Sequence, residues 1–147
     1  MKKIMTLLFT IMLLTACSET MNNDFNHYKF SGESEHWEAE YSYKVTEKWG
    51  EKNGTKTYSI EDGHEFVLKY KGSLEELSSL QKLKYSYETI SSSGKRTEEF
   101  TEPPSTVKFS SSGGSKGGAK VGEDEVIKVN VKWDDFEESF ELHNNSK

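Results

Sequence analysis

Cysteine is almost absent from this sequence. The 147 residues include a single cysteine, Cys17. One thiol cannot close a disulfide within the chain, and it cannot provide the repeated cysteine ligands of a structural zinc site. The folded part of the chain must therefore be stabilised by its hydrophobic core alone.

Long apolar runs are scarce as well. The longest covers residues 4–14 and is broken only by Thr6 and Thr10. As a helix this run would span ~17 Å, against roughly 30 Å for the hydrocarbon core of a bilayer. It is too short to predict a membrane-spanning helix, but a short apolar run behind the basic start Met1-Lys2-Lys3 is typical of a secretory signal peptide.

The residues after this run indicate which kind of signal it is. Leu14-Thr15-Ala16-Cys17 resembles the lipobox of bacterial lipoproteins, in which an apolar residue and two small residues precede a cysteine. The resemblance implies cleavage before Cys17 by the lipoprotein signal peptidase and a diacylglyceryl thioether on the cysteine sulfur. Two acyl chains can hold a protein on the outer face of the cell membrane, whereas one chain binds only marginally. The competing interpretation is an ordinary signal peptide that ends in a cysteine by chance.

The lipobox divides the chain into three parts. We expect a signal peptide at residues 1–16, a polar, lipid-anchored tether at 17–26 and one folded domain at 27–147. Removal of the signal peptide takes away two lysines and changes the formal net charge from −6 to −8. An acidic surface argues against nucleic acid and anionic lipid headgroups as partners, because phosphate contacts need clustered lysine and arginine.

Aromatic residues, in contrast, are plentiful and occur in alternating patterns. The clearest pattern places five residues on one face of a strand, with polar residues between them: Trp37, Ala39, Tyr41, Tyr43 and Val45. Alternation with a period of two predicts a strand with one buried face. Similar alternation predicts further strands around residues 28–32, 66–70, 83–89 and 127–142.

Turn signals join these strands. Asn53-Gly54 suits a type I′ hairpin, and Asp62-Gly63 and Asp134-Asp135 are predicted as further turns. Ser73 and Glu76 match a capping box and predict one short helix of about one to two turns. Residues 110–118 are rich in serine and glycine, so we expect a mobile loop there.

The number of strands and the short turns set the fold class. About seven to eight strands with short connections predict an all-β domain of antiparallel strands. The architecture that fits best is an immunoglobulin-like β-sandwich with one short helix, and a small antiparallel barrel is the competing architecture.

The whole chain resembles small lipoproteins of Gram-positive bacteria that have no assigned activity. The likeness rests on the lipobox, the aromatic strand, the Gly-rich loop and two closing segments, Val129-Asn130-Val131-Lys132-Trp133 and Ser139-Phe140-Glu141-Leu142. Apart from the lipobox, these motifs are packing patterns. The resemblance implies a location and a sandwich fold, but no catalytic residues.

Residues with metal-binding or catalytic chemistry do not form a recognisable pattern. The four histidines are scattered, and we interpret them as solvated surface residues: His27, His36, His64 and His143. Glu123-Asp124-Glu125 lacks the regular spacing of a calcium loop. In the Gly-rich stretch, Gly118 is followed by Ala119 and not by the Lys-Ser/Thr of a phosphate-binding loop. We therefore predict no catalytic residue, no metal and no cofactor.

Trp49 is the one candidate for ligand binding, because an aromatic side chain beside a hairpin tip could stack on a sugar or a peptide. The favoured function is a membrane-anchored, non-enzymatic module that binds a protein, a peptide or a cell-wall component. One alternative is an envelope enzyme that uses a carboxylate site. Another is an acidic protein of the immunity type, which captures a cationic peptide and protects the producing cell; only the net charge supports it.

Overall fold

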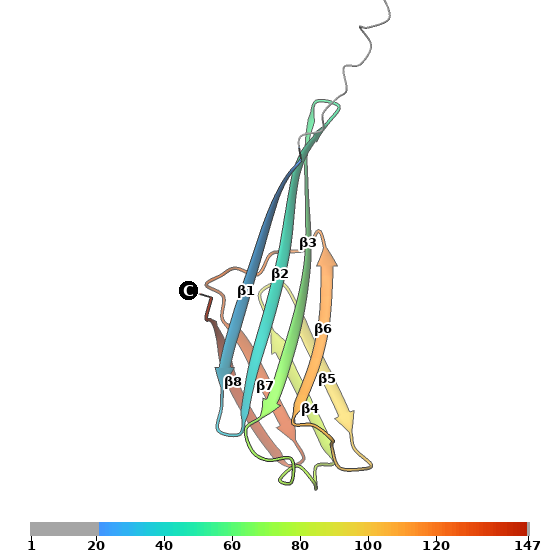
Figure 1. The fold of residues 1–147 in the computed structure, drawn as a ribbon, viewed down its shortest axis with the longest axis vertical. Coiled ribbons are helices and arrows are strands. Elements are labelled where there is room, and N and C mark those ends of the chain that lie inside the picture. The colour runs from blue at the N-terminus through green and yellow to red at the C-terminus, as the bar shows by residue number, and fades with distance from the viewer. Residues whose placement is uncertain (1–20, 147) are drawn as a thin grey trace, which may run out of the picture.

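The computed structural model describes residues 21–146, which fold into eight antiparallel strands (Figure 1). The strands are β1 (Asn22–Glu33), β2 (Trp37–Lys52), β3 (Thr55–Tyr70), β4 (Lys82–Glu88), β5 (Ser93–Glu99), β6 (Lys108–Lys116), β7 (Ile127–Trp133) and β8 (Phe136–Asn144). Neighbouring strands are hydrogen-bonded in the order β5-β4-β7-β8-β1-β2-β3-β6. The predicted all-β antiparallel class is confirmed.

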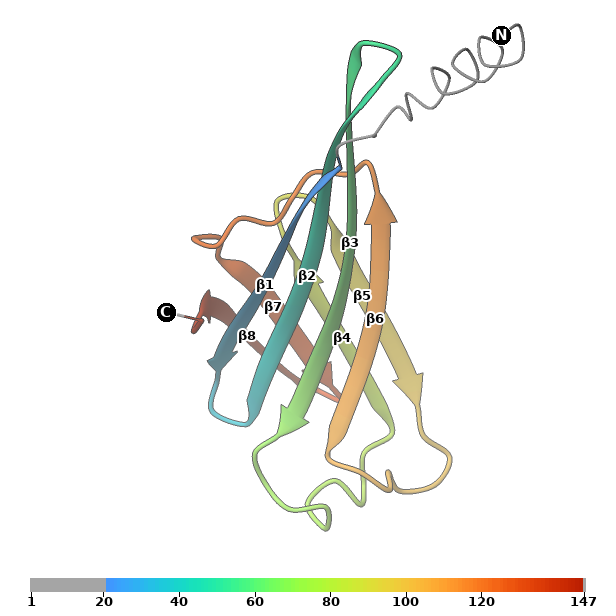
Figure 2. The same ribbon diagram turned by 45° about the horizontal axis from the view of Figure 1, so that its top comes forward.

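The sheet curls into a nearly closed barrel, as Figure 2 shows. β1 joins β8 through only two residue pairs, which involve Phe30 and Ser31 of β1. At the two edges of the sheet, Arg96 of β5 donates a hydrogen bond from Nη1 to the carbonyl oxygen of Ser110 in β6, at 3.2 Å. The structure does not confirm the predicted immunoglobulin-like sandwich, because the strands form one continuous sheet. The small barrel, the competing architecture, describes it more closely.

The aromatic residues of the strands fill the barrel. The five alternating residues of β2 are all buried, as predicted: Trp37, Ala39, Tyr41, Tyr43 and Val45. From the neighbouring strand, Phe66 of β3 stacks on Tyr85 and Tyr87 of β4, with ring centroids 5.7 and 4.7 Å apart. Rings from opposite sides of the barrel therefore form one core, as expected for a barrel of eight strands.

Two of the three predicted turns are confirmed. Asn53 and Gly54 have positive φ angles of 54° and 76°, which a type I′ turn requires, and they join β2 to β3. Asp134, with a φ of 49°, lies in the turn between β7 and β8. The turn predicted at Asp62-Gly63 is wrong, because β3 runs through these residues and pairs with β2 on one side and β6 on the other.

The predicted short helix is not seen. Residues 74–79 form successive turns closed by bonds between residues three apart, such as Leu77 N to the carbonyl oxygen of Leu74 at 3.2 Å. Ser73 still accepts a hydrogen bond from the Glu76 amide, at 3.4 Å, but the Glu76 carboxylate binds the Tyr70 hydroxyl. The Glu76 carboxylate therefore does not complete the capping box, and residues 74–79 form turns but no helix.

The prediction of a mobile loop at residues 110–118 is wrong. Residues 110–116 belong to β6 and pair with β3 along one edge of the sheet. Small side chains do not oppose this pairing, and a Cβ on Gly114 would lie 2.6 Å from the carbonyl oxygen of Asp62. Serine and glycine therefore allow close approach of two backbones here, rather than mobility.

The domain also begins earlier than predicted. Residues 22–26, which were expected to belong to the tether, pair with β2 as the first part of β1. The expected signal peptide at 1–16 and the lipobox residues Leu14, Thr15, Ala16 and Cys17 lie outside the described residues. Within residues 21–146, no helix has the length and apolar character needed to cross a membrane.

Candidate functional site

A pocket of about 250 Å³ lies at the lower end of the barrel in Figure 1, where three connections meet. These connections are the β1–β2 turn, the segment between β3 and β4, and the β7–β8 turn. The lining residues are His36, Tyr70, Glu76, Leu77, Ser79, Leu80, Trp133, Asp134 and Phe136. Leu77 and Leu80 are buried and supply apolar lining, and the other lining residues are polar or aromatic.

One wall of the pocket is aromatic. Trp133 and Phe136 face each other across the β7–β8 turn, with ring centroids 5.6 Å apart and planes inclined by 23°. The sequence pattern predicts Phe136 on the buried face of its strand, but its side chain is 63% exposed. The strand ends at the rim of the barrel, where no further layer covers its inward face. Phe136 therefore presents an open ring face to solvent.

The pocket wall is acidic next to these rings. Oδ1 of Asp134 accepts hydrogen bonds from the backbone amides of Gln81 and Lys82, at 3.1 and 3.0 Å. Oε2 of Glu76 accepts a bond from the Tyr70 hydroxyl at 3.1 Å. One oxygen of each carboxylate is thus used to hold the side chain in place at the pocket.

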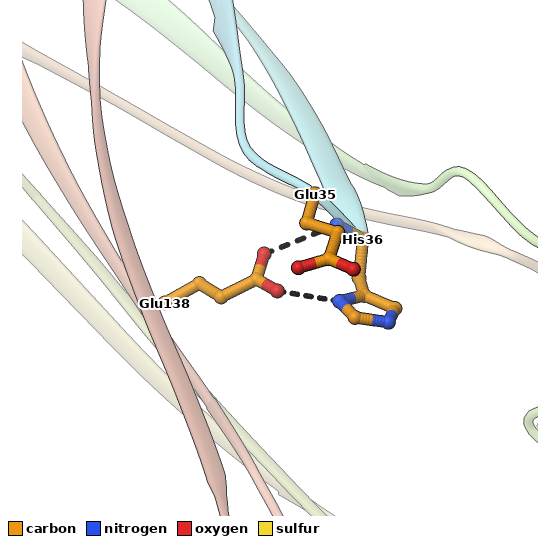
Figure 3. A group of neighbouring side chains, drawn as sticks. All are labelled: Glu35, His36 and Glu138. Atoms are coloured by element: carbon orange, nitrogen blue, oxygen red, sulfur yellow. Dashed lines mark hydrogen bonds and ion pairs between the residues drawn. The ribbon is translucent and has the colours of Figure 1, made fainter.

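Glu138 joins β8 to the β1–β2 turn beside the pocket (Figure 3). Its carboxylate accepts hydrogen bonds from the Ser34 hydroxyl, from the His36 amide at 3.1 Å and from His36 Nδ1 at 2.5 Å. The hydrogen bond to Glu138 raises the pKa of His36. Burial opposes ionisation of Glu138, yet the bonds from Ser34 and His36 leave its pKa below the usual range. The pair is therefore an imidazolium–carboxylate ion pair at slightly acidic pH.

Glu35 completes a group of three side chains that could hold a metal ion. One ligand atom each of Glu35, His36 and Glu138 lies within 4.8 Å of the other two (Figure 3). Ligand atoms of a tetrahedral zinc ion lie about 2.0–2.2 Å from the metal, which places them roughly 3.3 Å apart. His36 and Glu138 are hydrogen-bonded at 2.5 Å instead, and they would have to separate to admit an ion. The geometry favours a structural ion pair over a metal site.

Two other hollows differ from this pocket in their polar contacts. A wider groove of about 570 Å³ lies on the outer face of β1–β3, where charged side chains pair with one another, as Lys69 does with Glu38 at 2.6 Å. A cavity of about 200 Å³ lies inside the opposite end of the barrel. There Tyr43 donates to Asp62 at 3.2 Å, and the His64 ring is hydrogen-bonded to the Tyr87 hydroxyl at 2.7 Å.

The residues considered in the sequence do not come together. Trp49 is half exposed at the far end of β2 and packs on Tyr58, so it takes no part in the pocket. His64 is not the solvated residue that was predicted, because its ring points into the barrel and burial lowers its pKa. Glu125 accepts hydrogen bonds from the backbone amides of Ile90 and Gly122, which is a structural role.

Sequence reasoning missed the pocket, although one signal pointed to it. Glu138 is the single charged residue on the inward-facing side of β8, between Phe136 and Phe140. A carboxylate on the apolar face of a strand is costly to bury unless it is paired. His36 pairs with Glu138 here. The partner could not be identified from the sequence, because the two residues are 102 positions apart.

No protein-family model, no curated protein and no solved structure matches this chain. The chemistry of the site therefore has to be inferred from its own residues. An open aromatic face beside fixed carboxylates is suited to a cationic group, which the ring attracts electrostatically and the carboxylates neutralise.

Proposed function

We propose that this protein is a lipid-anchored, extracytoplasmic binding module without enzymatic activity, and that its pocket takes a cationic group of a peptide, protein or cell-wall component. The observation that carries the proposal is the exposed Phe136 ring, which stacks on Trp133 and lines the same pocket as Asp134 and Glu76. A lysine or arginine side chain can place its charge over a ring and beside a carboxylate at once. The same residues support the alternative of an acidic protein that captures a cationic peptide.

The anchor is proposed from the lipobox, and the fold is compatible with it. Asn22, the first residue of β1, pairs with Trp49 at the upper end of β2. The pocket lies at the other end, where the Trp37 ring is 5.6 Å from that of Trp133. The part of β2 between Trp37 and Trp49 spans ~40 Å at ~3.3 Å per residue. A protein held by Cys17 would thus present the pocket away from the membrane.

Hydrogen bonding at Ser34 supports a binding role over a hydrolytic one. In a nucleophilic triad the hydroxyl donates to the histidine, and the carboxylate orients that histidine from its other nitrogen. Here the Ser34 hydroxyl donates to Glu138 itself, so the imidazole of His36 does not activate it. The carboxylate enzyme considered as an alternative would need a different arrangement of these residues.

Tetralysine is a suitable probe of the pocket. We expect the full chain, purified from membranes, to bind it in isothermal titration calorimetry and to bind tetraserine far more weakly. Phe136→Ala and Glu76→Gln should each weaken binding, because one removes the ring and the other a negative charge. Phe25→Ala is the matched control, since Phe25 is 65% exposed at the opposite end of the protein. Equal binding of the two peptides, or equal loss in the control, would contradict the proposal.

A further inference from the structure

The exposed large hydrophobic side chains are distributed unevenly between the two ends of the protein. Of the eight within residues 21–146, six lie at the end where β1 begins: Met21, Phe25, Trp49, Tyr58, Ile90 and Val126. The other two, Leu74 and Phe136, lie at the pocket end. Large exposed apolar groups gathered in one region mark an interaction surface, whereas scattered ones need no explanation.

Two of these side chains, Trp49 and Tyr58, belong to an arm formed by residues 46–61, where β2 and β3 continue past the barrel, and Phe25 of β1 pairs with its first residue, Thr46. Figures 1 and 2 both show the arm rising above the rim, with the start of β1 beside it. Near the base of the arm, Lys120 pairs with Glu47 at 3.0 Å. Residues 51–59 are all exposed, so no other element covers the tip. A two-stranded ribbon gains little stability from its own contacts. We therefore expect an arm of this length to be stabilised by contact with another surface.

Trp49 and Tyr58 form the aromatic part of the arm. They lie directly opposite each other, with ring centroids 4.3 Å apart, and they are 50% and 48% exposed. The Tyr58 hydroxyl donates to Glu47 at 2.8 Å, which holds the pair in place. Tryptophan and tyrosine are the residues enriched at the membrane–water interface, because each has a large apolar ring and a polar edge.

The tip of the arm is basic, although Glu47 and Glu61 at its base make the whole arm, residues 46–61, formally neutral. Between residues 48 and 58 there are three lysines, Lys48, Lys52 and Lys56, and one acidic residue, Glu51. The net charge of −6 for the whole chain argued against anionic lipids, but it conceals this distribution. Lysines placed next to exposed aromatic rings are attracted to an anionic membrane surface over about one Debye length.

We propose that the arm docks on the membrane that holds the lipid anchor, with Trp49, Tyr58, Phe25 and Met21 at the level of anionic phospholipid headgroups. This inference rests on the proposed lipidation of Cys17. Asn22 follows Cys17 by five residues, a length that spans at most about 18 Å when fully extended. Because Asn22 pairs with Trp49, the arm cannot lie far from the lipid on Cys17. Anchor and arm together make two membrane contacts, which orient the barrel with its pocket outward.

Quenching of tryptophan fluorescence by brominated lipids tests the docking. The full chain, purified from bacterial membranes, is reconstituted in vesicles of phosphatidylglycerol and phosphatidylcholine with brominated acyl chains. We expect quenching and a blue shift of the emission, both lost in Trp49→Phe, because Trp37 is buried and Trp133 lies at the pocket end. Mass spectrometry of the Cys17 peptide in the same preparation reports the anchor separately.

Charge reversal of the lysines tests the docking while Trp49, the fluorescent reporter, is kept. Lys48→Glu/Lys52→Glu/Lys56→Glu should reduce quenching, whereas the same charge change near the pocket end, Lys82→Glu/Lys108→Glu/Lys132→Glu, should not. A lipidated protein without Trp49 quenching would overturn the docking and leave the anchor intact. Unmodified Cys17 would overturn the anchor and the docking with it. Quenching that persists in Trp49→Phe would also overturn the docking. So would a Trp49 that a second copy of the protein shields from solvent to the same extent in detergent.

Discussion

Nδ1 of His36 lies 2.5 Å from Oε1 of Glu138 and ties the β1–β2 turn to β8. The ladder between β1 and β8 has only two residue pairs, so this contact supports the weakest strand junction on that side of the barrel. The His36 ring is also 5.6 Å from Trp133, which connects the junction to the pocket wall. The same ion pair therefore supports the β1–β8 junction and helps to shape the pocket.

The first prediction concerns pH. Because the folded-state pKa of His36 is raised, its contribution to stability is complete below ~6.5, the usual value, and is lost as pH rises through the folded pKa. Glu138 has a lowered pKa, so its contribution is present above ~4.5 and is lost as pH falls through the folded value. Thermal midpoints should show the advantage of the wild type over His36→Gln shrinking above neutral pH. An advantage of the wild type that stays constant as pH rises through this range would contradict the ion pair.

The second prediction concerns the approach of β1 to β8. A Cβ on Gly32 would lie 2.0 Å from the carbonyl oxygen of Glu141, and backbone at that position cannot move aside cheaply. Gly32→Ala should therefore lower the free energy of unfolding by ~1–3 kcal/mol, as overpacking typically does. Gly122→Ala is the control, because nothing lies within 4 Å of its Cβ position. Equal denaturant midpoints for the two variants would show that the junction tolerates a wider spacing.

Strands with one buried face could be predicted from the sequence, and edge strands could not. Apolar and polar residues alternate from Trp37 to Val45 because one face of β2 is buried. A period of two therefore indicates which face of a strand is buried. β5 and β6 lie at the edges of the sheet with mostly exposed side chains, so their sequences carry little alternation. Their pairing depends on backbone hydrogen bonds to β4 and β3, which any residue except proline can make.

The choice of a barrel over a sandwich, and the pocket, depend on long-range contacts. A sandwich and a barrel both bury one face of each strand, so the same alternation predicts either. The positions of the strand ends decide which residues reach the pocket. Phe136 falls at a position that the alternation predicts to be buried, but it lies at the rim of the barrel and is exposed. Trp49 was singled out correctly as exposed, yet a single aromatic position cannot show whether it faces a ligand or a lipid.

The third prediction tests the core. Tyr41 is fully buried, and its ring stacks on His64 with centroids 5.1 Å apart. Tyr41→Ala should cost ~3–5 kcal/mol of unfolding free energy, the usual cost of truncating a buried aromatic residue. Glu40 is the neighbouring residue on the outer face and pairs with Lys29 at 3.2 Å in solvent, so Glu40→Ala should stay within roughly ±0.5 kcal/mol. Similar urea midpoints for both variants would mean that the barrel interior does not carry the stability.

The last prediction separates charge from structure at the pocket. Asp134→Asn keeps an oxygen for the amides of Gln81 and Lys82, and asparagine tolerates the positive φ of 49° at this position, so the β7–β8 turn should remain intact. The change removes one negative charge from the pocket wall. We expect tetralysine affinity to fall by up to about fivefold, which corresponds to ~1 kcal/mol for a solvent-accessible ion pair. The thermal midpoint should stay close to that of the wild type.

Asp135→Asn is the matched control, because Asp135 lies in the same turn and is exposed but does not line the pocket. It makes the same change in net charge, so any effect of overall charge on a cationic peptide appears in both variants. A larger loss of affinity in Asp134→Asn than in Asp135→Asn therefore measures the pocket itself, and the difference should shrink as salt is added. Equal losses in the two variants would mean that tetralysine responds to the acidic surface in general, and the pocket would no longer account for the proposed function.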